Sequence, residues 1–132
     1  MRTLLSAAIA ASFLIAAGCN NAKSPDAVSN DVAKAEQKGA AEVAKSEDNA
    51  AKNLDSAAGK VDDKLVDFSN QAAKDAYNVT VAKADAQLKV ALARCEGMSG
   101  DAQKSCKDQA QAEYDAAKAN AKAAAQANKQ SS

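Results

Sequence analysis

Three cysteines, Cys19, Cys95 and Cys106, are the residues best suited to chemistry in this chain of 132 residues. A thiol can act as a nucleophile, a metal ligand or one half of a disulfide. The chain has no histidine, so it lacks the usual base of a Ser-His or Cys-His pair and the commonest metal ligand. Cys95 and Cys106 also do not have the C-x-x-C spacing of a redox or zinc motif. We therefore expect no enzymatic activity, no metal and no cofactor.

The charged residues predict solvated surface and give no sign of a nucleic-acid partner. The adjacent acids Glu47-Asp48 and Asp62-Asp63 would point about 100° apart on a helix, which favours exposure over an acid/base pair. Lys and Arg number 17, and so do Asp and Glu. Because the charges balance, no basic field would attract nucleic acid.

The N-terminus has the pattern of an export signal that ends at a modified cysteine. Arg2 precedes 15 uncharged residues, Thr3 to Ala17, and a permanent transmembrane helix would need about 20 apolar residues. The last two of these residues and the two that follow them form the sequence Ala16-Ala17-Gly18-Cys19, which resembles a bacterial lipobox. The resemblance implies removal of residues 1–18, acylation of Cys19 and a polar tether over residues 19–27. Asn20, where an Asp would imply retention at the inner membrane, implies an outer-membrane lipoprotein facing the periplasm.

The lipobox resemblance also bears on the other two cysteines. If Cys19 is acylated, Cys95 and Cys106 remain as an even pair in an exported protein. A disulfide between them suits an oxidising periplasm. Closing the loop from Cys95 to Cys106, of about a dozen residues, stabilises the fold by roughly 3 kcal/mol in the chain-entropy model.

Alanine dominates the composition, with 36 residues of 132. Beyond residue 18, only sixteen large apolar residues remain, too few to form a dense globular core. Abundant Ala, Lys, Glu and Gln favour helix, and no segment alternates like a strand. We predict an all-α, elongated chain of amphipathic helices.

The predicted helical region spans residues 28–96, with a possible break near Gly59. Its start is indicated by Ser24 as N-cap, Pro25 and Asp26. Steps of four, three and four residues from Val28 give an almost wholly apolar series with a period of eleven, a hendecad pattern similar to that of a coiled coil. The largest apolar side chains of the series lie towards the C-terminal half of this helical region, where we place an interaction stripe at Val61, Leu65, Phe68, Leu88 and Leu92.

The run Gly97-Met98-Ser99-Gly100 predicts a turn over residues 97–100, with Gly97 in the left-handed conformation that ends a helix and Ser99 or Asp101 as the next N-cap. A second helix over residues 101–127 would complete an αα-hairpin, leaving 128–132 as a polar tail. Its narrow face is expected at Ala102, Cys106, Ala110, Tyr114 or Ala117, Ala121 and Ala124.

The lipobox, the polar start Cys19-Asn20-Asn21-Ala22-Lys23 and the Ala/Lys/Asp-rich helix resemble the murein lipoprotein group and other small Ala/Lys-rich envelope proteins of proteobacteria. That group is attached to murein through a C-terminal Lys, whereas this chain ends Lys129-Gln130-Ser131-Ser132. The resemblance implies a non-catalytic, membrane-anchored protein that contacts a helical protein, a second copy or peptidoglycan. The alternative is an amphipathic protein of the late-embryogenesis-abundant type, which protects or binds lipid surfaces.

Overall fold

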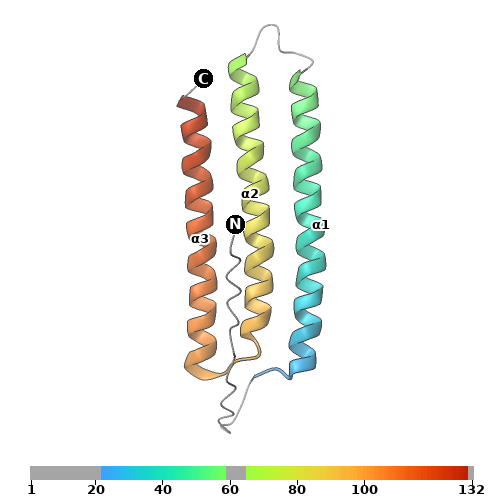
Figure 1. Cartoon of the computed structure of the whole chain (residues 1–132), viewed down its shortest axis with the longest axis vertical. Coiled ribbons are helices and arrows are strands. Elements are labelled where there is room, and N and C mark those ends of the chain that lie inside the picture. The colour runs from blue at the N-terminus through green and yellow to red at the C-terminus, as the bar shows by residue number, and fades with distance from the viewer. Residues whose placement is uncertain (1–21, 59–64, 131–132) are drawn as a thin grey trace, which may run out of the picture.

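The computed structural model describes residues 22–58 and 65–130, which form three long helices: α1 (Pro25–Ala58), α2 (Leu65–Cys95) and α3 (Gly100–Gln130). They lie side by side and alternate in direction, with α2 between α1 and α3 (Figure 1). The two outer helices do not contact each other. The fold is therefore all-α, as predicted, and is a single layer of helices that is roughly 50 Å long at about 1.5 Å per residue.

Helix α1 begins where its capping residues predict. The Ser24 Oγ accepts a hydrogen bond from the Ala27 amide at 3.3 Å, and the Ser24 carbonyl accepts one from Val28 at 3.0 Å. Pro25, which has no amide hydrogen to lose, takes the first helical position. The polar tether predicted over residues 19–27 is thus shorter, because its last three residues are helical. The signal segment 1–18 lies outside the described residues.

The chain reverses direction between Ala58 and Leu65, so α1 folds back along α2. Gly59, the predicted break, lies outside the described residues. Paired charges set the register of these two helices: Glu36 approaches Arg94 at 3.9 Å, Glu42 pairs with Lys89 at 2.6 Å, and Glu47 pairs with Lys83 at 2.9 Å. The residue number rises on α1 while it falls on α2, as an antiparallel pair requires.

The apolar series of four, three and four residues matches the less exposed face of α1 but does not continue through α2. Every position of the series from Val28 to Ala57 is half-buried, apart from the buried Gly39. On α2, Phe68, Ala72 and Val79 are half-buried, but the exposed Ala76 interrupts the series. The single stripe fails there because α2 has a neighbour on each of two opposite sides and therefore needs two packing faces.

The turn between α2 and α3 differs from the prediction at one glycine. Among the described residues, only Gly100 has a positive φ, of 57°, so Gly97 does not adopt the left-handed conformation. Instead, Gly97 packs against α1, where a Cβ would lie 3.3 Å from a methyl carbon of Val28. Helix α3 begins directly after Ser99, one of the two predicted N-caps, and it continues to Gln130 rather than ending at residue 127.

Small residues form the core of the layer. Among the described residues, the buried apolar side chains are only Ala73, Ala84, Cys95, Ala110 and Ala121. Two residues predicted for the narrow face of the last helix, Ala102 and Ala124, are exposed, and Gln103 and Ala125 are half-buried in their place. Helices that meet through alanine approach closely and bury little area, so stability depends on additional links.

Candidate functional site: a stapled end and a polar groove

A disulfide joins α2 to α3 at the end of the hairpin. Cys95 and Cys106 are bonded, with their Cα atoms 5.7 Å apart and within the usual range for a disulfide. Cys95 is fully buried, while Cys106 is half-buried. The predicted pairing is confirmed. Cys19, the predicted lipid-attachment residue, lies outside the described residues.

The segment just before α1 is held against this stapled end. The Lys23 amide donates a hydrogen bond to the Glu96 carbonyl at 2.9 Å. The Lys23 ammonium contacts Asp31 at 2.8 Å and lies 3.9 Å from Glu96, whose carboxylate also accepts a hydrogen bond from Lys107 at 2.6 Å. We call Lys23, Asp31, Glu96 and Lys107 the N-terminal clamp. It ties all three helices together at the end where the described part of the chain begins.

Ionisation of the clamp follows from these contacts. The hydrogen bond from Lys23, with its positive charge, lowers the pKa of Asp31, and the same bond raises the pKa of Lys23. The hydrogen bond from Lys107 is the main cause that lowers the pKa of Glu96. Lys23, Asp31 and Glu96 are therefore charged at neutral pH.

The predicted interaction stripe is divided between the two helix interfaces. Leu88 and Leu92 lie seven and three residues before Cys95, so they share the face of α2 that carries the disulfide to α3. Phe68 lies seven residues before Asp75, on the face towards α1. All three side chains are half-buried. Val61 and the side chain of Leu65 lie outside what is described.

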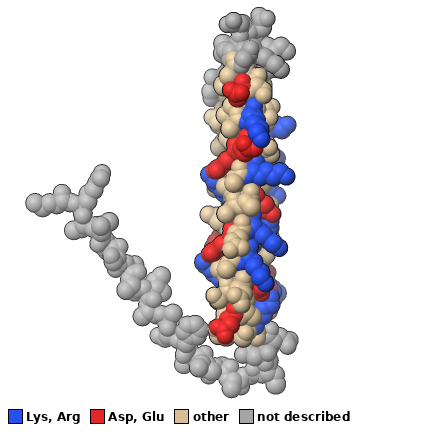
Figure 2. All heavy atoms as spheres, turned by 90° about the vertical axis from the view of Figure 1, so that its right-hand side faces the viewer, with Lys and Arg blue, Asp and Glu red and all other residues tan. Residues whose placement is uncertain are grey.

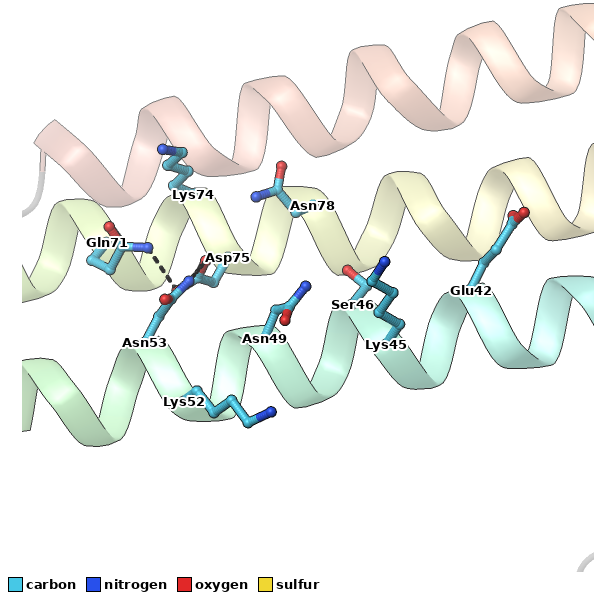
Figure 3. A pocket seen from close by; sticks show the side chains of 10 residues that line it. All are labelled: Glu42, Lys45, Ser46, Asn49, Lys52, Asn53, Gln71, Lys74, Asp75 and Asn78. Atoms are coloured by element: carbon cyan, nitrogen blue, oxygen red, sulfur yellow. Dashed lines mark hydrogen bonds between the residues drawn. The ribbon is translucent and has the colours of Figure 1, made fainter.

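A polar groove of about 570 Å³ runs between α1 and α2 in the half of the layer away from the disulfide. Ten side chains line it (Figure 3): Glu42, Lys45, Ser46, Asn49, Lys52, Asn53, Gln71, Lys74, Asp75 and Asn78. They supply three ammonium groups, two carboxylates, four amides and a hydroxyl. The groove can therefore both donate and accept hydrogen bonds.

Asp75 forms the buried part of this groove. It is only 4% exposed, and its two carboxylate oxygens accept hydrogen bonds from the Asn53 amide at 3.0 Å and the Gln71 amide at 2.9 Å. Amides from two helices thus converge on one carboxylate, as Figure 3 shows. Its position on the face towards α1 becomes visible only once α1 and α2 are known to pair.

Charges elsewhere alternate along the molecule. Viewed from the α1 side, basic and acidic side chains are interspersed over the whole length of the layer (Figure 2). In the described ranges, no three His, Cys, Asp or Glu side chains gather as a metal site. None of the three helices, over the residues described, is apolar enough to span a bilayer.

No protein-family model, curated protein or solved structure matches this chain. The groove, the clamp and the disulfide are therefore interpreted from their own residues.

Proposed function

We propose that this protein is a lipid-anchored, non-catalytic spacer of the bacterial envelope, held by acylated Cys19 at the periplasmic face of the outer membrane. The N-terminal clamp is the observation that supports this proposal best. Ala22, the first described residue, is three positions beyond Cys19, and three extended residue steps reach at most about 11 Å. An anchor at Cys19 would therefore hold the disulfide end close to the lipid.

The opposite end of the layer would then extend into the periplasm. The end of α1, the start of α2 and the end of α3 all lie there (Figure 1). At about 1.5 Å per residue, that end stands roughly 50 Å from the clamp. The disulfide and the N-terminal clamp hold the helices together at the end that is joined to the anchor. A rod built in this way suits the separation of a membrane from a partner or a cell wall.

Replacing the anchor residue tests the proposal. Cys19→Ala should release the protein from membranes into the soluble periplasmic fraction, and intact mass should show no acyl chains. The matched control is the double variant Cys95→Ala/Cys106→Ala, which should stay acylated and membrane-bound. A Cys19→Ala protein that remains lipid-modified and sediments with membranes would contradict the anchoring.

The alternative protective function makes a different prediction. A protein of the late-embryogenesis-abundant type would have little helix in solution and gain it only with vesicles or on drying. The spacer should instead be highly helical in buffer and melt cooperatively, as measured by circular dichroism.

A further inference from the structure

Two grooves meet at one lysine on the membrane-distal half of the layer. The groove between α1 and α2 has been described above. A second, of about 370 Å³, lies between α2 and α3 and is lined by Lys74, Tyr77, Lys122, Ala125 and Gln126. Lys74 lines both grooves, and its side chain lies on the α3 side of α2 in Figure 3. The grooves therefore adjoin and form one surface across all three helices.

This surface carries ammonium groups that lack carboxylate partners. Among the described residues, Lys45, Lys74 and Lys122 form no ion pair, whereas Lys52 is paired with Asp48 at 2.5 Å. Of the two carboxylates that line the surface, Glu42 is paired with Lys89, and Asp75 is buried beneath its amides. The surface therefore presents an excess of positive charge to a ligand.

Neutral polar groups and one aromatic ring complete the surface. Ser46, Asn49 and Asn78 line the first groove without hydrogen-bond partners among the side chains that the structure describes. Amides both donate and accept, so they complement hydroxyl groups, which do the same. Tyr77 is half-buried and lines the second groove together with Lys74 and Lys122, and an aromatic ring offers an apolar face to a ligand.

The carboxylates distinguish between anionic ligands. A phosphate chain presents only hydrogen-bond acceptors. The Glu42 carboxylate would repel such a chain, and the acceptor oxygens of the amides would find no donor on it. A sugar presents hydroxyl donors to these oxygens, its ring can lie on an aromatic face, and an acidic group on it would pair with a lysine. We propose that this two-groove surface, centred on Lys74, binds an anionic, hydroxyl-rich oligosaccharide.

The inference deepens the proposed function and rests on it only for location. Anchored at Cys19, the chain would hold this surface some tens of ångströms from the membrane, where it would meet a carboxylated glycan of the envelope. Binding itself can be measured on the purified protein, whatever its location, so the two proposals can fail separately.

Isothermal titration of the purified full chain, with its disulfide intact and in detergent, tests the inference. The probe is a tetrasaccharide of hexuronic acid, with a neutral hexose tetrasaccharide and linear tetraphosphate for comparison. We expect saturable binding of the uronate and at least about tenfold weaker binding of both others. Lys74→Gln should weaken uronate binding about tenfold, the loss expected for one charged hydrogen bond.

Lys83→Gln is the matched control. Nine residues along α2 place Lys83 on the opposite side of the helix from Lys74, and its partner Glu47 is exposed. This variant should bind the uronate within about twofold of the native chain. An equal loss in both lysine variants, equal binding of tetraphosphate, or no binding of the uronate would overturn the inference. Circular dichroism verifies that both variants remain folded.

Discussion

Gly39 on α1 and Ala86 on α2 meet so closely that a Cβ on Gly39 would lie 2.6 Å from the Ala86 Cβ. Real Cβ atoms do not approach to that distance, so the two helix backbones pack at a separation that only glycine permits. Gly39 is accordingly the one buried residue of α1. A glycine that lowers helix propensity in isolation thus stabilises the pairing of α1 with α2.

Gly39→Ala should therefore destabilise the protein, even though alanine in an exposed helix would gain about 1 kcal/mol. The added methyl group must push the helices apart, which typically costs about 1–3 kcal/mol, and the obstructing atoms belong to the Ala86 side chain and backbone. We expect a net loss of up to about 2 kcal/mol in the free energy of unfolding, measured with urea.

Exchanging the two residues provides the control. The double variant Gly39→Ala/Ala86→Gly moves the methyl group to the other helix, so it should recover part of the lost stability. A single Gly39→Ala variant more stable than the native chain would show that α1 and α2 do not approach closely in solution.

Reduction of the Cys95–Cys106 disulfide should lower the melting temperature by about 10 °C or more. The two cysteines are eleven positions apart in the sequence, and the chain-entropy model assigns roughly 3 kcal/mol to a loop of this size. The alanines on α3 bury too little area to replace that contribution. Thermal circular dichroism with and without reductant measures the effect. Cys95→Ala/Cys106→Ala, which lacks the bond, should not respond to reductant.

The N-terminal clamp should weaken in acid. The pKa values of Asp31 and Glu96 are lowered in the folded state, so these groups stabilise the fold above their unfolded pKa values. The contribution is complete above the unfolded pKa values of about 4 and is lost as the pH falls below them and through the lowered folded values. Lys23, whose pKa is raised by its hydrogen bond to Asp31, remains charged throughout this range.

Glu96→Gln isolates this effect. At pH 7 the substitution should lower the melting temperature slightly, on the order of 1–2 °C for exposed ion pairs, and the difference from the native chain should be smaller at pH 3, which lies below the usual pKa of a glutamate. Glu113→Gln serves as the control, because this exposed side chain on α3 has no ion pair among the described residues and accepts a hydrogen bond from Gln109 that an amide oxygen can also accept. It should differ little from the native chain at both pH values. A deficit in Glu96→Gln that persists unchanged at pH 3 would contradict the clamp.

Removal of the buried Asp75 carboxylate should also lower the free energy of unfolding. Asp75→Ala leaves the amides of Asn53 and Gln71 without their acceptor, a loss of about 1–3 kcal/mol. Asp75→Asn should cost less, because either amide can turn its oxygen towards the new NH₂ group. Asp85→Ala, a half-buried acid in a surface pair on the same helix, should cost less than about 1 kcal/mol. Equal stabilities for the two alanine variants would rule out the Asp75 network.

Local signals in the sequence were sufficient to predict much of this fold. The cap at Ser24 and Pro25 placed the start of α1 correctly, because capping depends only on neighbouring residues. The half-buried face of α1 followed from its spacing, and the confirmed Cys95–Cys106 pair followed from cysteine arithmetic together with the lipobox resemblance.

Features that depend on pairing could not be predicted in this way. Glu42 has Lys45 nearby on its own helix, yet it pairs with Lys89 on α2. A glycine within a helix lowers helix propensity, so Gly39 alone does not indicate a stabilising contact, and Asp75 gave no sign of being buried. In each case the deciding partner comes from a helix that is distant in sequence, so the polar groove became apparent only when α1 and α2 were placed together.

The orientation of the layer on a membrane is the central claim, and energy transfer to a lipid-headgroup acceptor tests it most directly. A fluorescent residue would replace either Asp101, at the clamp end of α3, or Ala124, which is 23 residues farther along; both positions are exposed. The acylated protein would be reconstituted in vesicles. The two positions differ by about 35 Å along the helix axis.

An anchored, upright spacer predicts strong energy transfer from position 101 and weak transfer from position 124. Equal, strong transfer from both positions would mean that the helices lie flat on the lipid. That result would contradict the spacer and support the amphipathic lipid-binding alternative.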